Sequence, residues 1–122
     1  MNKFILLLLL SSNIYAQDFI SSDEFKIKTS KGISVVEFWA EWNKNNEVQF
    51  LETLKDCITY KLCIVSNSKI QKEYEIIAIP TVIIFNNGVE QERFNPNIMM
   101  QLSATKKEVQ SVIDEITLNK FQ

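Results

Sequence analysis

The stretch that decides the fold is Val35 to Asn46, with the sequence Val-Val-Glu-Phe-Trp-Ala-Glu-Trp-Asn-Lys-Asn-Asn. Its first half is largely apolar and favours a buried strand, whereas its second half is a polar turn that contains Trp42. We expect a helix to begin directly after the turn. In α/β proteins this order places a site at the carboxyl end of the strand. The turn is therefore the first candidate for a functional site.

The segments on either side of this stretch have helix and strand patterns. The strand itself is expected over Ile33–Trp39, buried on both faces. Before it, Ser21–Glu24 has the capping-box pattern and predicts a short helix that ends near Gly32. After it, we expect a longer helix over about residues 44–56, capped by Asn43. Its evidence is a set of apolar residues at helical spacing, namely Val48, Phe50, Leu51 and Leu54.

The middle of the chain predicts a further strand and a short helix. The apolar run Leu62–Val65 favours a strand, and Asn67 or Ser68 can cap a helix that carries Ile70 and Tyr74. Strands that alternate with helices in this way are typical of a parallel sheet with crossover connections.

The last third predicts a hairpin and a terminal helix. Asn86-Asn87-Gly88 favours a tight turn between strands at Val82–Phe85 and Val89–Phe94, because asparagine and glycine tolerate positive φ. Thr105–Glu108 is a second capping box. It opens a helix with one apolar face, formed by Val109, Val112, Ile113 and Ile116. The sequence thus predicts an α/β fold with a mixed parallel and antiparallel sheet flanked by helices.

The first sixteen residues, Met1–Ala16, have the pattern of a secretory signal peptide. Lys3 precedes the apolar run Phe4–Leu10, and the small residue Ala16 stands at the expected cleavage site. The apolar run is too short for a permanent membrane anchor. We therefore expect an exported chain, periplasmic or secreted, with a single domain over residues 17–122.

Composition excludes several classes of function. The chain of 122 residues has a net charge of −2, so the basic surface needed for nucleic acid or anionic membranes is not expected. It contains no histidine, which removes the commonest general base and most zinc-site designs. We predict no metal site and no cofactor. Thiol chemistry, carboxylate chemistry or binding without chemistry remain.

The two cysteines, Cys57 and Cys63, leave three interpretations open. An even number of cysteines in an exported chain is most simply explained by one disulfide. The pair could instead be a redox-active dithiol, or the two residues could be separate buried thiols. Spacing alone does not decide between these interpretations.

The residues Phe-Trp-Ala-Glu-Trp at 38–42 resemble the active-site segment of the thioredoxin family, in which Cys-x-x-Cys follows directly. Here Asn43-Lys44-Asn45-Asn46 stands in place of that motif. Ile79-Pro80-Thr81 resembles the family's cis-proline turn, and the order of elements is similar over nearly the whole of residues 17–122. The resemblance implies a thioredoxin-like fold.

The resemblance also has consequences for chemistry. Thiol exchange needs a thiolate and a second, resolving thiol, and an amide is no nucleophile at neutral pH. With Asn43 and Asn46 at these positions, we expect no exchange at the family's usual site. Glu37 stands at the family's buried-acid position, which implies a raised pKa. The resemblance places Cys57 and Cys63 at the end of the domain opposite Trp42.

The family's substrates lie across three segments, and the corresponding residues here are Trp42, Ile79, Pro80, Thr81, Met99 and Met100. Methionine is flexible and polarisable, and the cis-proline turn leaves backbone groups free for an extended peptide. We expect a non-catalytic module that binds an extended polypeptide or a partner protein. The alternatives are a thiol-disulfide oxidoreductase acting through Cys57 and Cys63, and a scaffold or assembly subunit. The oligomeric state is left open.

Overall fold

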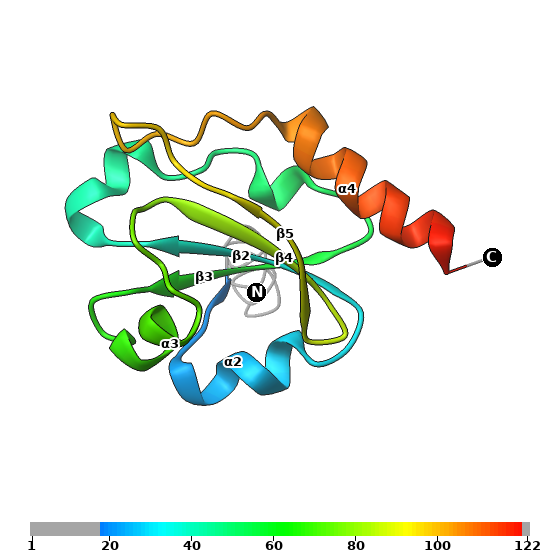
Figure 1. Cartoon of the computed structure of the whole chain (residues 1–122), viewed down its shortest axis with the longest axis horizontal. Helices are drawn as coiled ribbons and strands as arrows, with labels where there is room; N and C mark the ends of the chain where they lie inside the picture. Colours follow the sequence, from blue (N-terminus) through cyan, green and yellow to red (C-terminus); the bar gives the residue numbers. More distant parts are fainter. Residues whose placement is uncertain (1–17, 121–122) are drawn as a thin grey trace, which may run out of the picture.

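The computed structural model describes residues 18–120, and the predicted signal peptide Met1–Ala16 lies outside them. Within residues 18–120 the strands form one five-stranded sheet with the order β1-β3-β2-β4-β5 (Figure 1). The pairs β1–β3 and β2–β3 are parallel, and the pairs β2–β4 and β4–β5 are antiparallel. The mixed α/β sheet that the sequence predicts is confirmed.

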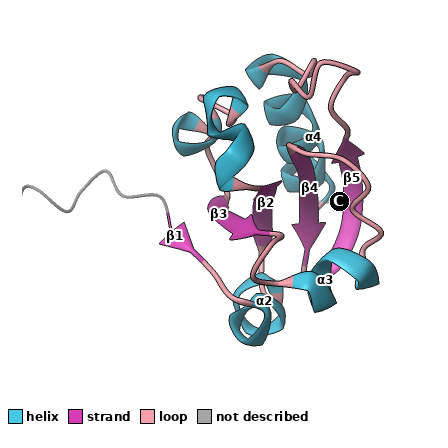
Figure 2. Cartoon of the chain, turned by 90° about the vertical axis from the view of Figure 1, so that its left-hand side faces the viewer, coloured by secondary structure: helices cyan, strands magenta, loops and turns pink. Residues whose placement is uncertain are grey.

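The strands are β1 (Asp18–Phe19), β2 (Ile33–Trp39), β3 (Ile58–Cys63), β4 (Thr81–Asn86) and β5 (Val89–Phe94). The α-helices are α2 (Ser22–Thr29), α3 (Ser68–Glu73) and α4 (Lys106–Asn119), and two 3₁₀-helices are η1 (Glu41–Asn46) and η2 (Leu51–Thr53). Figure 2 shows α2 and α3 on one face of the sheet and α4 on the other. Among residues 18–120, no helix has the length and apolar character needed to cross a membrane.

The strand β2 is the centre of the sheet, and all seven of its residues are buried. Its side chains alternate between two cores, as expected for a strand covered on both faces. Phe38 belongs to the core beneath α2 and α3 with Phe25, and Val35 belongs to the core beneath α4 with Ile113. The carboxyl end of β2 leads directly into η1, which puts η1 at the edge of both cores.

The local signals at the two capping boxes and at the hairpin are confirmed. The backbone N–H of Ser21 donates to the Glu24 carboxylate at 3.2 Å, and the N–H of Glu108 donates to Thr105 Oγ1 at 3.2 Å. Asn87 and Gly88 have φ values of 51° and 82°, so the β4–β5 turn uses the positive φ that its sequence favours.

The long helix expected over residues 44–56 is wrong, and so is the cap assigned to Asn43. Two short 3₁₀-helices occur instead, separated by extended backbone at Glu47 with ψ of 151°. The N–H of Val48 donates to the Glu37 side chain at 3.1 Å rather than to a helical carbonyl. Of the apolar residues at helical spacing, only Leu51 lies in a helix, because Val48 and Leu54 fall in the irregular backbone on either side of η2. Of the four apolar residues that the sequence picks out, Val48, Leu51 and Leu54 are buried and Phe50 is partly buried.

The strand expected at Leu62–Val65 is misplaced, because β3 begins at Ile58 and ends at Cys63. The predicted strand covers only the apolar run, and a lysine such as Lys61 is rarely buried without a partner. Lys61 is nevertheless buried, with its ammonium paired to Glu47. The ion pair neutralises the buried lysine, so the strand can include it. Because β3 begins earlier than predicted, Cys57 and Cys63 also lie at different places in the fold than predicted.

Candidate functional site

Three segments meet at the carboxyl end of β2, namely η1, the Ile79–Pro80 turn and the loop after β5. The large exposed side chain of η1 is Trp42. It lies on η1 with 64 % of its surface exposed. The neighbouring exposed residues Glu41 and Lys44 form a surface ion pair at 3.3 Å, which contributes little to stability. A large aromatic side chain exposed on a polar turn offers apolar contact area at low entropic cost to a partner.

Asn43 and Asn46 do not cap a helix but link η1 to the two other segments. Asn43 Nδ2 donates to the carbonyl of Ile79 at 3.4 Å and to that of Met100 at 3.2 Å. Asn46 Nδ2 donates to Asn43 Oδ1 at 2.9 Å, and Gln101 Nε2 donates to Asn46 Oδ1 at 3.4 Å. We refer to Asn43, Asn46 and Gln101 as the amide network. It joins η1, the Ile79–Pro80 turn and the loop after β5.

The Ile79–Pro80 turn offers backbone rather than side chains. The Ile79–Pro80 peptide bond is cis, and the side chains of Ile79, Pro80 and Thr81 are all buried. The hydroxyl of Thr81 donates to the Ala78 carbonyl at 2.6 Å, which closes the turn internally. Ile77, by contrast, is 96 % exposed just before the turn. The large exposed side chain of this segment is therefore Ile77, which the sequence analysis does not single out.

The loop after β5 supplies the third segment. Met99 is 69 % exposed, and the neighbouring Ile98 is almost fully exposed. Met100 has a different role, because it packs partly buried against the core beneath α2 and α3 and has φ of 59°. Of the two methionines that the sequence predicts as contacts, Met99 presents its side chain outward and Met100 anchors the loop.

Beneath this surface lies a buried carboxylate, Glu37. Its side chain has 0 % exposure, and Oε2 accepts the Val48 N–H at 3.1 Å. Oε1 has no hydrogen-bond partner among residues 18–120. Burial raises the pKa of Glu37 to about 7, against the lowering effects of the Val48 hydrogen bond and of Lys61. The pKa expected from the sequence is raised, and its cause is desolvation.

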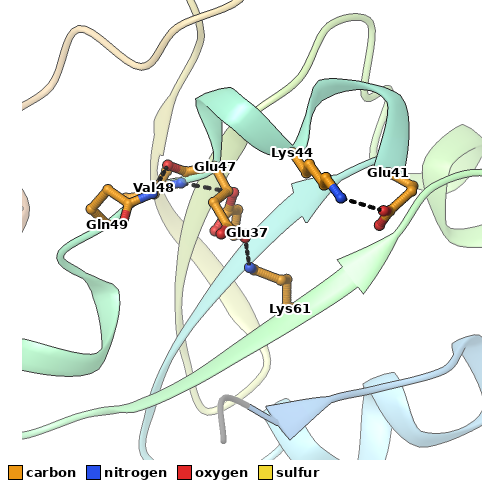
Figure 3. A network of polar contacts seen from close by, with 7 residues as sticks. All are labelled: Glu37, Glu41, Lys44, Glu47, Val48, Gln49 and Lys61. Atoms are coloured by element: carbon orange, nitrogen blue, oxygen red, sulfur yellow. Dashed lines mark hydrogen bonds and ion pairs between the residues drawn. The ribbon is translucent and has the colours of Figure 1, made fainter. Parts of the chain in front are cut away.

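Two further charged residues, Lys61 and Glu47, complete this region and were missed by the sequence argument. Lys61 pairs with Glu37 in the β2–β3 register, yet its Nζ forms an ion pair with Glu47 Oε2. Figure 3 shows Lys61 reaching from β3 toward both carboxylates. The Nζ atom lies 4.9 Å from the centre of the Trp39 ring, within cation–π distance. A lone lysine between Tyr60 and Leu62 is the signal that could have revealed this group.

The cysteine prediction is wrong in its leading form. Cys57 and Cys63 are both free thiols. Cys57 stands just before β3 and Cys63 at its end, so their Cα atoms are about 20 Å apart along the strand, whereas a disulfide needs Cα atoms within about 7 Å. This distance also rules out an intramolecular dithiol made by the two. Cys63 pairs in register with Trp39 and so lies at the same end as η1, not at the opposite end.

Cys57 is a poor nucleophile. Burial and the neighbouring Asp56 carboxylate raise the pKa of its thiol to about 11, so thiolate is scarce at neutral pH. Cys63 is half-buried. No group of three or more His, Cys, Asp or Glu side chains positioned to hold a metal ion occurs within residues 18–120.

Comparison with solved structures defines the class of protein. Over 81 % of its length the chain superposes on 88 % of a thioredoxin variant from Halobacterium salinarum, with a TM-score of 0.64 and 17 % identity. It also matches a thioredoxin from Malassezia sympodialis over 84 % of this chain and 95 % of that one, with a TM-score of 0.57 and 23 % identity. The fold is therefore the α/β thioredoxin-like fold.

Sequence comparison narrows the class to a family. The chain is 35 % identical over 80 residues to the thioredoxin of Chlamydia pneumoniae, a match that covers 61 % of this chain and 78 % of that protein. No family model matches the chain. The chain belongs to the thioredoxin family, as the resemblance around Trp42 and Pro80 predicts.

Proposed function

We propose that this chain is an exported, non-catalytic member of the thioredoxin family that binds an extended polypeptide or a partner protein. The binding surface consists of Trp42, the Ile79–Pro80 turn with Ile77, and Met99. The single observation that carries the proposal is the exposure of Trp42 beside two segments that are joined to η1 by the amide network.

The hydrogen bonds at this surface support binding without exchange chemistry. At the positions that the family resemblance assigns to the two thiols, the chain has amides, and both amides are engaged in holding the loops together. The remaining cysteines are too far apart to cooperate within one chain. A surface whose segments are already fixed in place loses less entropy on binding than a mobile one.

The proposal is tested with peptides selected on the wild-type protein from a phage-displayed random library. Binding of a selected peptide is measured by fluorescence anisotropy. We expect Trp42→Ala to weaken it about 30-fold and Met99→Ala about 10-fold, as for buried contact residues of an interface. The matched control is Leu118→Ala on α4, which removes a side chain of similar exposure, 66 %, from another element.

Two results would overturn the proposed binding surface. One is that no peptide is selected above background. The other is that selected peptides bind Trp42→Ala and Leu118→Ala equally well. Circular dichroism of each variant shows whether the fold is retained.

Export is tested separately, since its support is the pattern of Met1–Ala16 alone. In a bacterial host we expect the full chain to be recovered outside the cytoplasm, with an intact mass that corresponds to a start at Gln17. Recovery of the uncleaved chain in the cytoplasm would refute export. The peptide-binding test of the proposed surface would not be affected by that result.

A further inference from the structure

A pocket of about 350 Å³ lies beside the Ile79–Pro80 turn, between the connection from α3 to β4 and the end of β5. We call it the β5 pocket, and its lining residues are Glu75, Ile77, Ala78, Arg93, Asn95 and Pro96. Ile77 also belongs to the proposed binding surface, and Asn95 and Pro96 begin the loop that carries Met99. Both segments lie at the end of the sheet toward which the β2 and β3 arrows point (Figure 1). The β5 pocket therefore continues the proposed binding surface.

One wall of the β5 pocket is the guanidinium of Arg93, whose charge is already paired. Its Nε and Nη2 atoms donate to the two carboxylate oxygens of Glu90 at 3.0 and 2.8 Å, a two-point contact that fixes the side chain. Nη1 donates to the backbone carbonyl of Glu75 at 3.4 Å. Because Glu90 balances its charge, Arg93 attracts an anionic ligand only weakly.

The carboxylate of Glu75 is the unpaired charge of the β5 pocket. Glu75 is exposed, and within residues 18–120 its side chain forms no ion pair. The pKa of Arg93 is raised, first by its hydrogen bond to Glu90 and also by the charge of Glu75, so both carboxylates lie close to this wall. The three charges sum to −1, and the whole chain has a net charge of −2. The electrostatic field at the pocket therefore favours a cation.

The other walls of the β5 pocket are largely apolar, since Ile77, Ala78 and Pro96 form them. Lysine and arginine have an aliphatic stem that packs against apolar surface and a charged end that stays in a polar environment. Ligand pockets usually measure about 300–1,000 Å³, so this one is at the lower end of the range. Its size and lining suit one long basic side chain.

We propose that the β5 pocket receives a lysine or arginine side chain of the polypeptide that binds across Trp42 and Ile77. The inference rests on the proposed function and adds the chemical class of the ligand, an extended segment with an apolar and a basic residue. An extended chain advances about 3.3 Å per residue with side chains on alternating sides. Because Ile77 lines both the pocket and the surface, the basic residue stands within about three positions of the apolar residue that contacts Ile77.

The test uses the peptides selected on the wild-type protein, in which we expect a lysine or arginine near an apolar residue. In one such peptide the basic residue is replaced by norleucine, which keeps an aliphatic stem and removes the charge. Glu75→Gln should weaken binding of the original peptide about fivefold, as for a partly exposed charge pair, and should leave binding of the norleucine peptide unchanged. The control is Glu92→Gln, which removes an exposed acid of β5 outside the pocket and should bind both peptides as the wild type does.

A charge exchange tests the pairing directly. Glu75 has φ of 51°, and glutamine and lysine, which are unbranched at Cβ as glutamate is, suit this backbone equally well. Glu75→Lys should weaken binding of the original peptide more than Glu75→Gln does. A peptide with glutamate in place of its basic residue should bind Glu75→Lys more tightly than it binds the wild type.

Selected peptides without lysine or arginine would overturn this inference, and so would a Glu75→Gln variant that binds the original peptide equally well or more tightly. If such peptides still lose affinity in Trp42→Ala, the proposed function is retained and only the role of the β5 pocket is refuted. Binding that depends on Glu75 but not on Trp42 would retain the β5 pocket and refute the proposed surface. Failure to select any peptide would refute both.

Discussion

The amide network and a second group, Glu37, Glu47 and Lys61, which we call the charged cluster, fix the same part of the chain by opposite means. The amide network holds η1 itself, through half-buried, neutral groups at Asn43 and at the last residue, Asn46. The charged cluster holds the two residues that follow η1, Glu47 and Val48, through the buried groups Lys61 and Glu37. Amides do not titrate in the physiological range, whereas the pKa of Glu37 is raised to about 7. One attachment should therefore be independent of pH, and the other should depend on it.

The largest expected effect comes from Glu37 itself. Its folded-state pKa of about 7 lies above the ordinary value of 4.5, so the native state retains the proton. This contribution to stability is full below pH 4.5 and is lost as the pH rises through 7, by about 3 kcal/mol in total. In Glu37→Gln the free energy of unfolding should vary much less over this window, as measured by urea denaturation at pH 5 and pH 8.

The control for this prediction is Glu92→Gln, which changes an exposed carboxylate on β5. Its stability profile should run parallel to that of the wild type. A Glu37→Gln profile that also runs parallel would show that Glu37 ionises alike in the folded and unfolded states, which contradicts its burial.

The next largest effect is expected from Asn43→Ala. It removes the donor to Ile79 and Met100 and leaves Asn46 without its acceptor, so we expect a loss of about 1–2 kcal/mol in the free energy of unfolding. Because no charge is involved, the loss should be equal at pH 5 and pH 8. Asn45→Ala, at the exposed neighbouring position, should change stability by less than about 0.5 kcal/mol.

The smallest effect belongs to the outer link of the amide network. Gln101 is exposed and makes one long hydrogen bond of 3.4 Å to Asn46. Gln101→Ala should cost about 0.5 kcal/mol, again independent of pH. A double-mutant cycle with Asn46→Ala measures the link directly, and a coupling energy of zero would remove Gln101 from the amide network.

Where local chemistry decides the structure, the sequence predicts it correctly. Capping residues at Ser21 and Thr105 and the Asn87-Gly88 turn act over three or four residues, so their hydrogen bonds can be anticipated from spacing. The segment Ile33–Trp39 is long and apolar enough that its sequence predicts a buried strand, as the structure shows. The fold class follows from the order of these elements.

The failures came where a distant group competes with local preference. The helix expected after Asn43 is interrupted because Val48 donates its N–H to Glu37, a residue on the preceding strand. The start of β3 is misplaced because Lys61 is buried with a partner, Glu47, that is distant in the sequence. Once β3 is four residues longer at its start, Cys57 and Cys63 fall at opposite ends of it, so the error in the cysteine prediction followed from the error in the strand.

The candidate site divides in the same way. The exposure of Trp42 could be predicted from an aromatic residue in a polar turn, whereas Met99 stands between the apolar residues Ile98 and Met100 and gives no such signal. The proximity of Gln101 to Asn46 depends on loop positions that no spacing reveals. The family resemblance located the three segments. The structure was needed to show which side chains in them point outward.

The central claim is that this member of the thioredoxin family uses amides to hold its site together and has no working pair of thiols. Its most direct test is equilibration of the domain in glutathione buffers of increasing oxidised fraction, followed by alkylation and intact mass. We predict that Cys57 and Cys63 never join within one chain and appear only as alkylated thiols or glutathione adducts. A monomer lighter by two hydrogens, and absent in Cys63→Ser, would contradict the claim.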